Sequence, residues 1–149
     1  MLFRSDSLDA NPVVLATLMA CHHAPFSNSK IVHSSEPVQQ KFVPSFLNSR
    51  KARIFITGHS HNFERFKHNG KDFVVIGGGG GLKQPLVKEE KKIKDKDLSD
   101  PYKPLFHYLI LRREGKTLHL TSRELLKGSS KEQPFGDFND SLHFSVSIQ

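Results

Sequence analysis

The chain has 149 residues, which suits one domain, with 36% hydrophobic residues and no tryptophan. Its formal charge of +7 would suit an anionic partner such as a phosphorylated substrate, but no basic stripe interleaved with aromatic residues indicates nucleic-acid binding. One cysteine excludes an intrachain disulfide, and no apolar run approaches the roughly 20 residues of a membrane span.

The first part of the chain predicts a buried strand. Residues 1–12 are polar and end in Asn11-Pro12, which indicates a turn. Residues 13–20 form a continuous apolar run, too short for a typical helix and rich in β-branched residues. Such a run is typical of an interior strand, most often in a parallel sheet.

The same apolar run, followed by Cys21, also resembles the core of a lipoprotein signal peptide. A signal of that kind needs positive charge in front of its core. Here Arg4 is outweighed by Asp6 and Asp9. We therefore expect a cytoplasmic protein, with secretion through a lipoprotein-like start at Cys21 as the alternative.

A pair of histidines, His22 and His23, follows this strand, and Pro25 fixes the turn after them. An imidazole should therefore be held at the strand's carboxyl end. Next, residues 34–49 predict a helix, since Ser34 or Ser35 can cap it and Pro37 suits its first turn. Pro44 should kink or split that helix.

The central stretch is a β-branched strand at residues 54–57, which Gly58 ends. His59 and His61 follow, and in extended chain their side chains would face the same way about 6.6 Å apart. They could ligate one ion, or two ions about 3.5–4 Å apart, and imidazole pairs suit Zn, Fe or Mn. The alternative is a polar loop with two incidental histidines.

A hairpin follows, because Asn-Gly within residues 67–70 is a strong turn signal. The returning strand, 73–76, runs into five glycines at 77–81, which permit close backbone approach beside a metal or phosphate. Residues 88–100 hold five lysines and five acidic residues and predict a charged surface loop.

The last third of the chain predicts antiparallel sheet. Residues 106–112 and 117–125 alternate as strands joined by a hairpin, and a short strand is expected at 142–148. His107 and His119 fall within this alternation and are interpreted as ordinary sheet residues.

Two motifs stand in order: His-x-Pro at His23-Ala24-Pro25, then Gly-His-x-His at residues 58–61. Together they resemble the C-terminal half of calcineurin-like metallophosphoesterases. The continuation at residues 62–65, Asn-Phe-Glu-Arg, and the glycine-rich strand end look most like the purple acid phosphatase branch. The resemblance covers roughly residues 10–125. It implies an α+β fold, the C-terminal half of a four-layer α/β/β/α sandwich with a mixed sheet and hairpins, so that residues 1–149 form one partial domain.

The resemblance also implies a hydrolase of phosphate esters that uses two divalent or trivalent metal ions, Fe, Zn or Mn. His23 and His59 would ligate one metal and His61 the other. His22 would contact the phosphate or donate a proton to the leaving group, or else be a surface imidazole. Glu64 and Arg65, of the purple acid phosphatase-like continuation, would fix the loop.

The family's acidic motifs are missing: Asp-x-His and Gly-Asn-His occur nowhere, and only 22 residues precede His23. Gly-Asp-x-x-Asp is spelled at residues 136–140, but it follows no apolar strand and is interpreted as coincidence. We therefore expect a partial metal site that is inactive in this chain alone. The expected partners are an N-terminal half or a second copy. The alternatives are half of a split enzyme and a non-catalytic module that binds a metal or a phosphate-bearing ligand.

Overall fold

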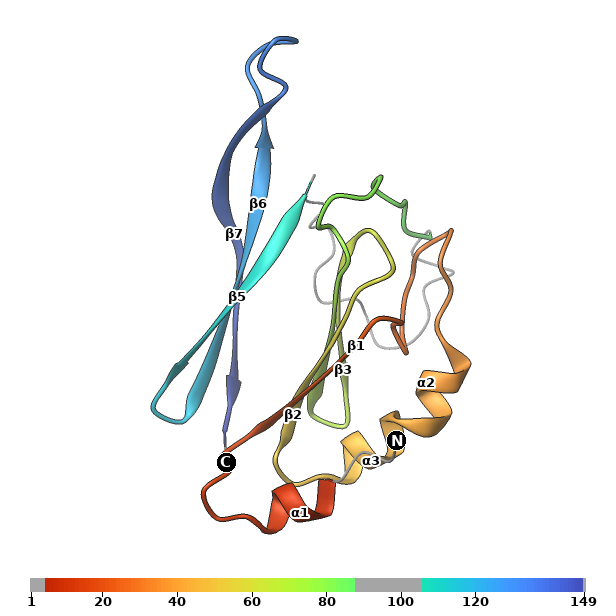
Figure 1. Ribbon diagram of the computed structural model, residues 1–149, viewed down its shortest axis with the longest axis vertical. Coiled ribbons are helices and arrows are strands. Elements are labelled where there is room, and N and C mark those ends of the chain that lie inside the picture. The colour runs from red at the N-terminus through yellow and green to blue at the C-terminus, as the bar shows by residue number, and fades with distance from the viewer. Residues whose placement is uncertain (1–4, 88–105, 149) are drawn as a thin grey trace.

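The computed structural model describes residues 5–87 and 106–148, which form an α+β fold of short helices and two β-sheets (Figure 1). The predicted fold class, α+β with a mixed sheet and hairpins, is confirmed. The charged loop predicted at 88–100 lies outside the described residues. The elements are α1 (Ser5–Ala10), β1 (Thr17–Cys21), α2 (Glu36–Lys41), α3 (Val43–Asn48), β2 (Ala52–Thr57), β3 (Phe63–His68), β4 (Lys71–Ile76), β5 (His107–Glu114), β6 (Thr117–Lys127) and β7 (Phe135–Ser147).

The first sheet has the strand order β1-β2-β4-β3. Strands β1, β2 and β4 are parallel, whereas β3 and β4 form the predicted antiparallel hairpin. Asn69 and Gly70 turn this hairpin with φ angles of 48° and 73°, which these two residue types adopt readily. The parallel strands all end at one edge of the sheet, where the histidine loops begin.

The predicted helix at 34–49 is split, as expected at Pro44. The proline cannot donate a backbone hydrogen bond, so α2 ends with Phe42 N–H donating to Val38 O and α3 begins at Val43. None of the helices within the described part of the chain is long and apolar enough to cross a membrane.

The sequence analysis placed the start of the first strand too early and missed α1. Strand β1 begins at Thr17, because residues 11–14 form a turn in which Val14 N–H donates to Asn11 O. Helix α1 is held by a tertiary contact: Asp9 accepts hydrogen bonds from Ser49 Oγ and from the backbone N–H groups of Arg50 and Lys51. Local sequence carries no signal for that contact.

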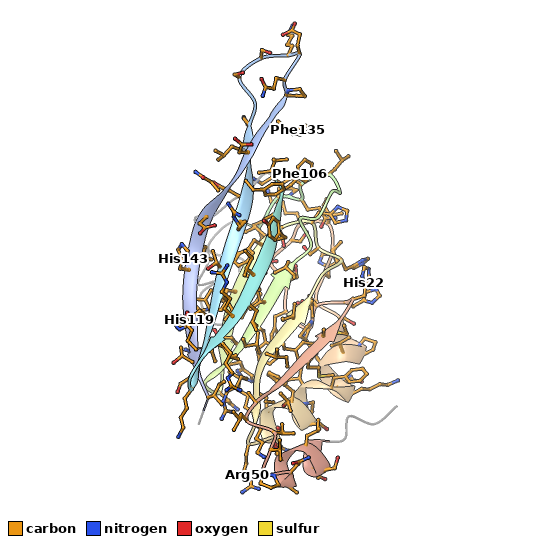
Figure 2. The ribbon with its side chains drawn as sticks, turned by 60° about the vertical axis from the view of Figure 1, so that its left-hand side comes forward. His22, Arg50, Phe106, His119, Phe135 and His143 are labelled. Atoms are coloured by element: carbon orange, nitrogen blue, oxygen red, sulfur yellow. The ribbon has the colours of Figure 1, made fainter. Side chains whose placement is uncertain are left out.

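The second sheet is antiparallel, with the order β5-β6-β7. Gly115, with φ of 55°, turns the predicted hairpin between β5 and β6. The last strand is longer than the predicted 142–148. It pairs with β6 from residue 135 onward, and the β6–β7 hairpin extends past the start of β5 at His107 (Figures 1 and 2).

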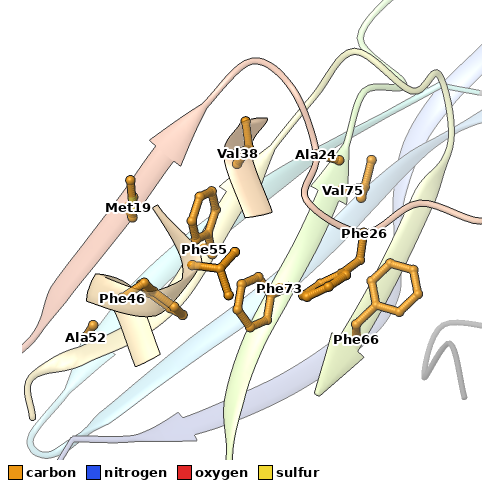
Figure 3. Packing of buried hydrophobic residues seen from close by; sticks show 11 residues of the cluster. Met19, Ala24, Phe26, Val38, Phe46, Ala52, Phe55, Phe66, Phe73 and Val75 are labelled. Atoms are coloured by element: carbon orange, nitrogen blue, oxygen red, sulfur yellow. The ribbon is translucent and has the colours of Figure 1, made fainter. Parts of the chain in front are cut away.

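Three layers pack on two apolar cores. One face of the first sheet packs against α2 and α3, with Phe46, Phe55 and Phe73 in mutual ring contact (Figure 3). The other face packs against the second sheet, where Ile54 and Val74 join Leu118, Leu120 and other residues. Both faces of β2 are therefore buried, which suits its β-branched and aromatic residues.

Strand β1 is an open edge, since within residues 5–87 and 106–148 no strand pairs with its outer side. Leu15 and Leu18, beside or on this strand, are each 44% exposed, and Val13 is 83% exposed. An unpaired strand edge with apolar side chains is a template for association. We therefore expect the chain to associate through this edge.

The substitution Leu18→Lys should shift the chain toward monomer, because a charged side chain on an edge strand opposes strand addition. Size-exclusion chromatography with light scattering, at equal concentrations of wild type and variant, measures this. Leu82→Lys is the control, since Leu82 is 89% exposed but lies in the loop after β4. A monodisperse wild-type monomer would show that the edge does not drive association.

His107, at the start of β5, is buried against the glycine run. The residue is 3% exposed, and the backbone N–H of His107 donates to Gly78 O at 3.0 Å. The imidazole ring packs edge-on against the Phe63 ring, with the two ring centroids 5.3 Å apart. Neither ring nitrogen has a hydrogen-bond partner among the described residues. Burial, with a smaller contribution from the charge of Lys83, lowers the pKa of His107 from 6.5 to about 4.

This lowered pKa predicts acid sensitivity. The unfolded chain takes up a proton at His107 near pH 6.5, whereas the folded chain does so only near pH 4. The free energy of unfolding is therefore unaffected by this group above pH 6.5, and it decreases as the pH falls from 6.5 to about 4. The difference corresponds to about 3 kcal/mol. Urea denaturation at pH 7 and 4.5 should show a smaller loss for His107→Phe than for wild type. Equal losses would contradict the prediction.

Candidate metal centre

The parallel pairing of β1 and β2 brings two histidine loops together. In the register of the two strands Cys21 lies opposite Thr57, and the pairing continues beyond them because Gly58 N–H donates to His22 O at 3.0 Å. His22 and His23 thus leave the sheet beside His59. Figure 2 shows His22 at the end of β1, whereas His119 and His143 lie on the second sheet.

His22, His23 and His59 form a cluster in which one ligand atom from each lies within 4.8 Å of the others. The ring centroids of His23 and His59 are 4.4 Å apart, and those of His22 lie 5.0 Å and 4.8 Å from them. His22 Nε2 and His59 Nδ1 share a hydrogen bond of 3.0 Å. His22 and His23 are exposed, and His59 is half-buried.

His59 has φ of 62°, a left-handed conformation that is uncommon for residues other than glycine. The backbone on both sides holds it there, since Gly58 N–H donates to His22 O and Ser60 N–H donates to Gly58 O. Burial, followed by the charges of His23, His22 and His61 when these are protonated, lowers the pKa of His59. The His59 ring therefore stays neutral, with a lone pair available for a metal, at a lower pH than an ordinary histidine does.

His61, predicted as a ligand with His23 and His59, is not a member of this three-residue cluster. Its Nδ1 lies 3.0 Å from Leu82 O. A carbonyl oxygen only accepts, so Nδ1 carries the proton and Nε2 carries the lone pair. Gly81 backs the ring so closely that a Cβ there would lie 2.2 Å from it. The structure thus brings His23 and His59 together and adds His22, for which the sequence analysis had proposed a role at the phosphate or none.

A buried carboxylate joins the two loops at their base. Glu64 of β3 is 0% exposed and accepts hydrogen bonds from Ser27 Oγ at 2.9 Å and from Asn28 N–H at 2.7 Å. Ser27 Oγ also lies 3.3 Å from Ser60 Oγ. These serines carried no sequence signal, because single serines in loops are common and only the fold brings them together.

Arg65, expected with Glu64 to fix the loop, joins the sheets instead. It pairs with Asp72 of β4 at 2.7 Å, and its guanidinium lies 3.9 Å from the ring centre of Phe144 on β7. Cys21 adds no thiolate to the cluster, since its Sγ donates to His23 O and burial raises the pKa of the thiol.

Comparison with known proteins identifies no family. No family model matches the chain, and no curated protein matches it. Among solved structures it is similar to GAP50, the anchor in the inner membrane complex of Plasmodium, at 14% identity and a TM-score of 0.51, over 97% of this chain and 41% of that one. It is also similar to Vps29 of Chaetomium thermophilum, at 12% identity and a TM-score of 0.48, over 89% of this chain and 56% of that one. The likeness to GAP50 shows the fold alone, and the chain spans about two fifths of that protein's length.

The glycine run, residues 77–81, offers a matched test of how much its packing against the loop after β2, residues 58–62, contributes to stability. A Cβ on Gly77 would lie 1.9 Å from Ser60 O, whereas a Cβ on Gly79 would meet nothing within 4 Å. Gly77→Ala should therefore lower the free energy of unfolding by about 1–3 kcal/mol, and Gly79→Ala should leave it nearly unchanged. Urea denaturation measures both. Equal effects would mean that the close approach of Gly77 to the loop is unimportant.

Proposed function

We propose that this chain supplies the histidine side of a metal-dependent phosphoesterase site. One observation carries the proposal: His23 and His59, from the His-x-Pro and Gly-His-x-His motifs, meet at the ends of adjacent parallel strands with ring centroids 4.4 Å apart. Two separate motifs of the resembled family thus converge at one point. The formal charge of +7 favours an anionic substrate such as a phosphate ester.

The donor chemistry fits a transition metal. Imidazole nitrogens suit Zn and Fe, whereas Mg and Ca prefer oxygen ligands. In the proposed site His23 and His59 hold one ion, and His61 presents Nε2 to the second, since its Nδ1 is occupied by Leu82 O. When bound, the ions would polarise the phosphoryl group and acidify water.

The remaining residues position the substrate and the loops. His22 is exposed beside His23 and can donate a hydrogen bond or a proton to an oxygen of the phosphate ester. Glu64, bound to Ser27 and Asn28, keeps the loop after β1 in place. This division of roles follows the one implied by the sequence resemblance.

Neutral imidazoles cannot balance two adjacent cations, so the proposed site needs carboxylates. Among the described residues none joins the histidine cluster, and Glu64 is already bonded to Ser27 and Asn28. We place the acidic ligands on a segment outside these 149 residues, in the same or another chain.

The purified chain should hydrolyse a generic aryl phosphate slowly or not at all with added Zn, Mn or Fe. Co-expression with a segment that carries the acidic motifs should restore turnover, and His59→Asn, which tolerates the left-handed backbone, should abolish it. A colorimetric assay of released phenol measures both.

Robust turnover by the chain alone would show that no further ligands are needed. Formation of the complex with metal bound but without turnover would favour the alternative, a non-catalytic binding module.

A further inference from the structure

The three-histidine cluster has the dimensions of a single coordination sphere. Nitrogens bound at 2.0–2.1 Å to a tetrahedral ion lie about 3.4 Å from one another. His22 Nε2 and His59 Nδ1 are already 3.0 Å apart, and the ligand atoms of His22, His23 and His59 all lie within 4.8 Å of one another. Small rotations of exposed side chains would therefore complete the geometry.

We infer that His22, His23 and His59 form a one-ion site of three imidazoles, which this chain loads by itself with Zn²⁺ or a similar transition-metal ion. In this state His22 is a metal ligand rather than a proton donor. The inference goes beyond the proposed function, since it requires neither a second ion, nor carboxylates, nor a phosphate ester.

The structure favours His22 over His61 as the third ligand. His61 has one nitrogen on Leu82 O and its ring against Gly81, so its position is fixed apart from the cluster. The His22 ring is exposed, and within the described residues it forms its hydrogen bond with another cluster member, His59. Breaking that bond frees the lone pair of the accepting nitrogen, and the donating ring offers a second lone pair once its proton moves to its other nitrogen. The cost is small, because exchange of such a bond with water is nearly balanced at an exposed site.

Charge and preorganisation point the same way. Three neutral donors around one dication leave a charge of +2 near the surface, without the repulsion between two adjacent cations that would demand carboxylates. The ring of His59 is set in place by its left-handed backbone, with φ of 62° and the hydrogen bonds of Gly58 and Ser60 on either side. Three imidazoles on Zn²⁺ leave a fourth position open to water or a small anion.

The test uses the tag-free 149-residue chain. Isothermal titration with Zn²⁺ should show one ion per chain, and Co²⁺ should give the visible absorption of a tetrahedral site. His22→Ala and His23→Ala should each weaken Zn²⁺ binding about tenfold or more, because loss of even a residue that only hydrogen-bonds a metal ligand lowers metal affinity by that factor. His119→Ala and His143→Ala, on the second sheet, are matched controls and should bind as the wild type does. Thermal melts without metal check that every variant folds.

Three outcomes would overturn the one-ion site: no Zn²⁺ binding by the wild type, two ions per chain, or loss of binding in His61→Ala with none in His22→Ala. The first leaves the phosphoesterase proposal standing, since that site draws ligands from another segment. Conversely, one ion held by the three histidines, with no hydrolysis in the presence of the acidic segment, supports this site and overturns the phosphoesterase.

Discussion

The parallel pairing of β1 with β2 is the constraint on which the rest of the site depends. Parallel strands end at the same edge of a sheet, so residues that follow them meet although they are distant in sequence. Cys21 lies opposite Thr57, and the pairing extends to His22 through Gly58. The apolar side chains of β2, buried between two cores, fix this register, because a slip by one residue would exchange its two faces.

The pairing alone would not fix the side chains, and buried polar contacts beneath the loops do so. Glu64, fully buried, would be costly without partners, and its hydrogen bonds to Ser27 and Asn28 satisfy it while they hold the loop after β1. Gln84 bonds in both directions with the backbone of His61. The histidines therefore stand on a rigid base although two of the three cluster members are exposed.

Sequence reasoning predicted the features that depend on local chemistry. It identified the split at Pro44 and the Asn69-Gly70 hairpin, because proline geometry and turn preference are read from neighbouring residues. The meeting of the His23 and His59 loops was implied by the family resemblance and not by a local pattern. It did not anticipate that His22 would join the cluster while His61 turns to Leu82. Side-chain direction after a left-handed residue is set by tertiary contacts, which no periodic pattern encodes.

The open sheet edge and the exposed side of the histidine cluster, which no carboxylate joins among the described residues, lie on the same strand, β1. Among the described residues no strand pairs with the outer edge of β1, and Leu18 on this strand is partly exposed. The exposed His22 and His23 directly follow the strand. A strand added parallel to β1 would end beside these histidines, since parallel strands terminate together. Residues after that strand could then supply carboxylates to the cluster. Covering the edge and completing a two-ion site would therefore be a single event, whereas the one-ion state needs neither.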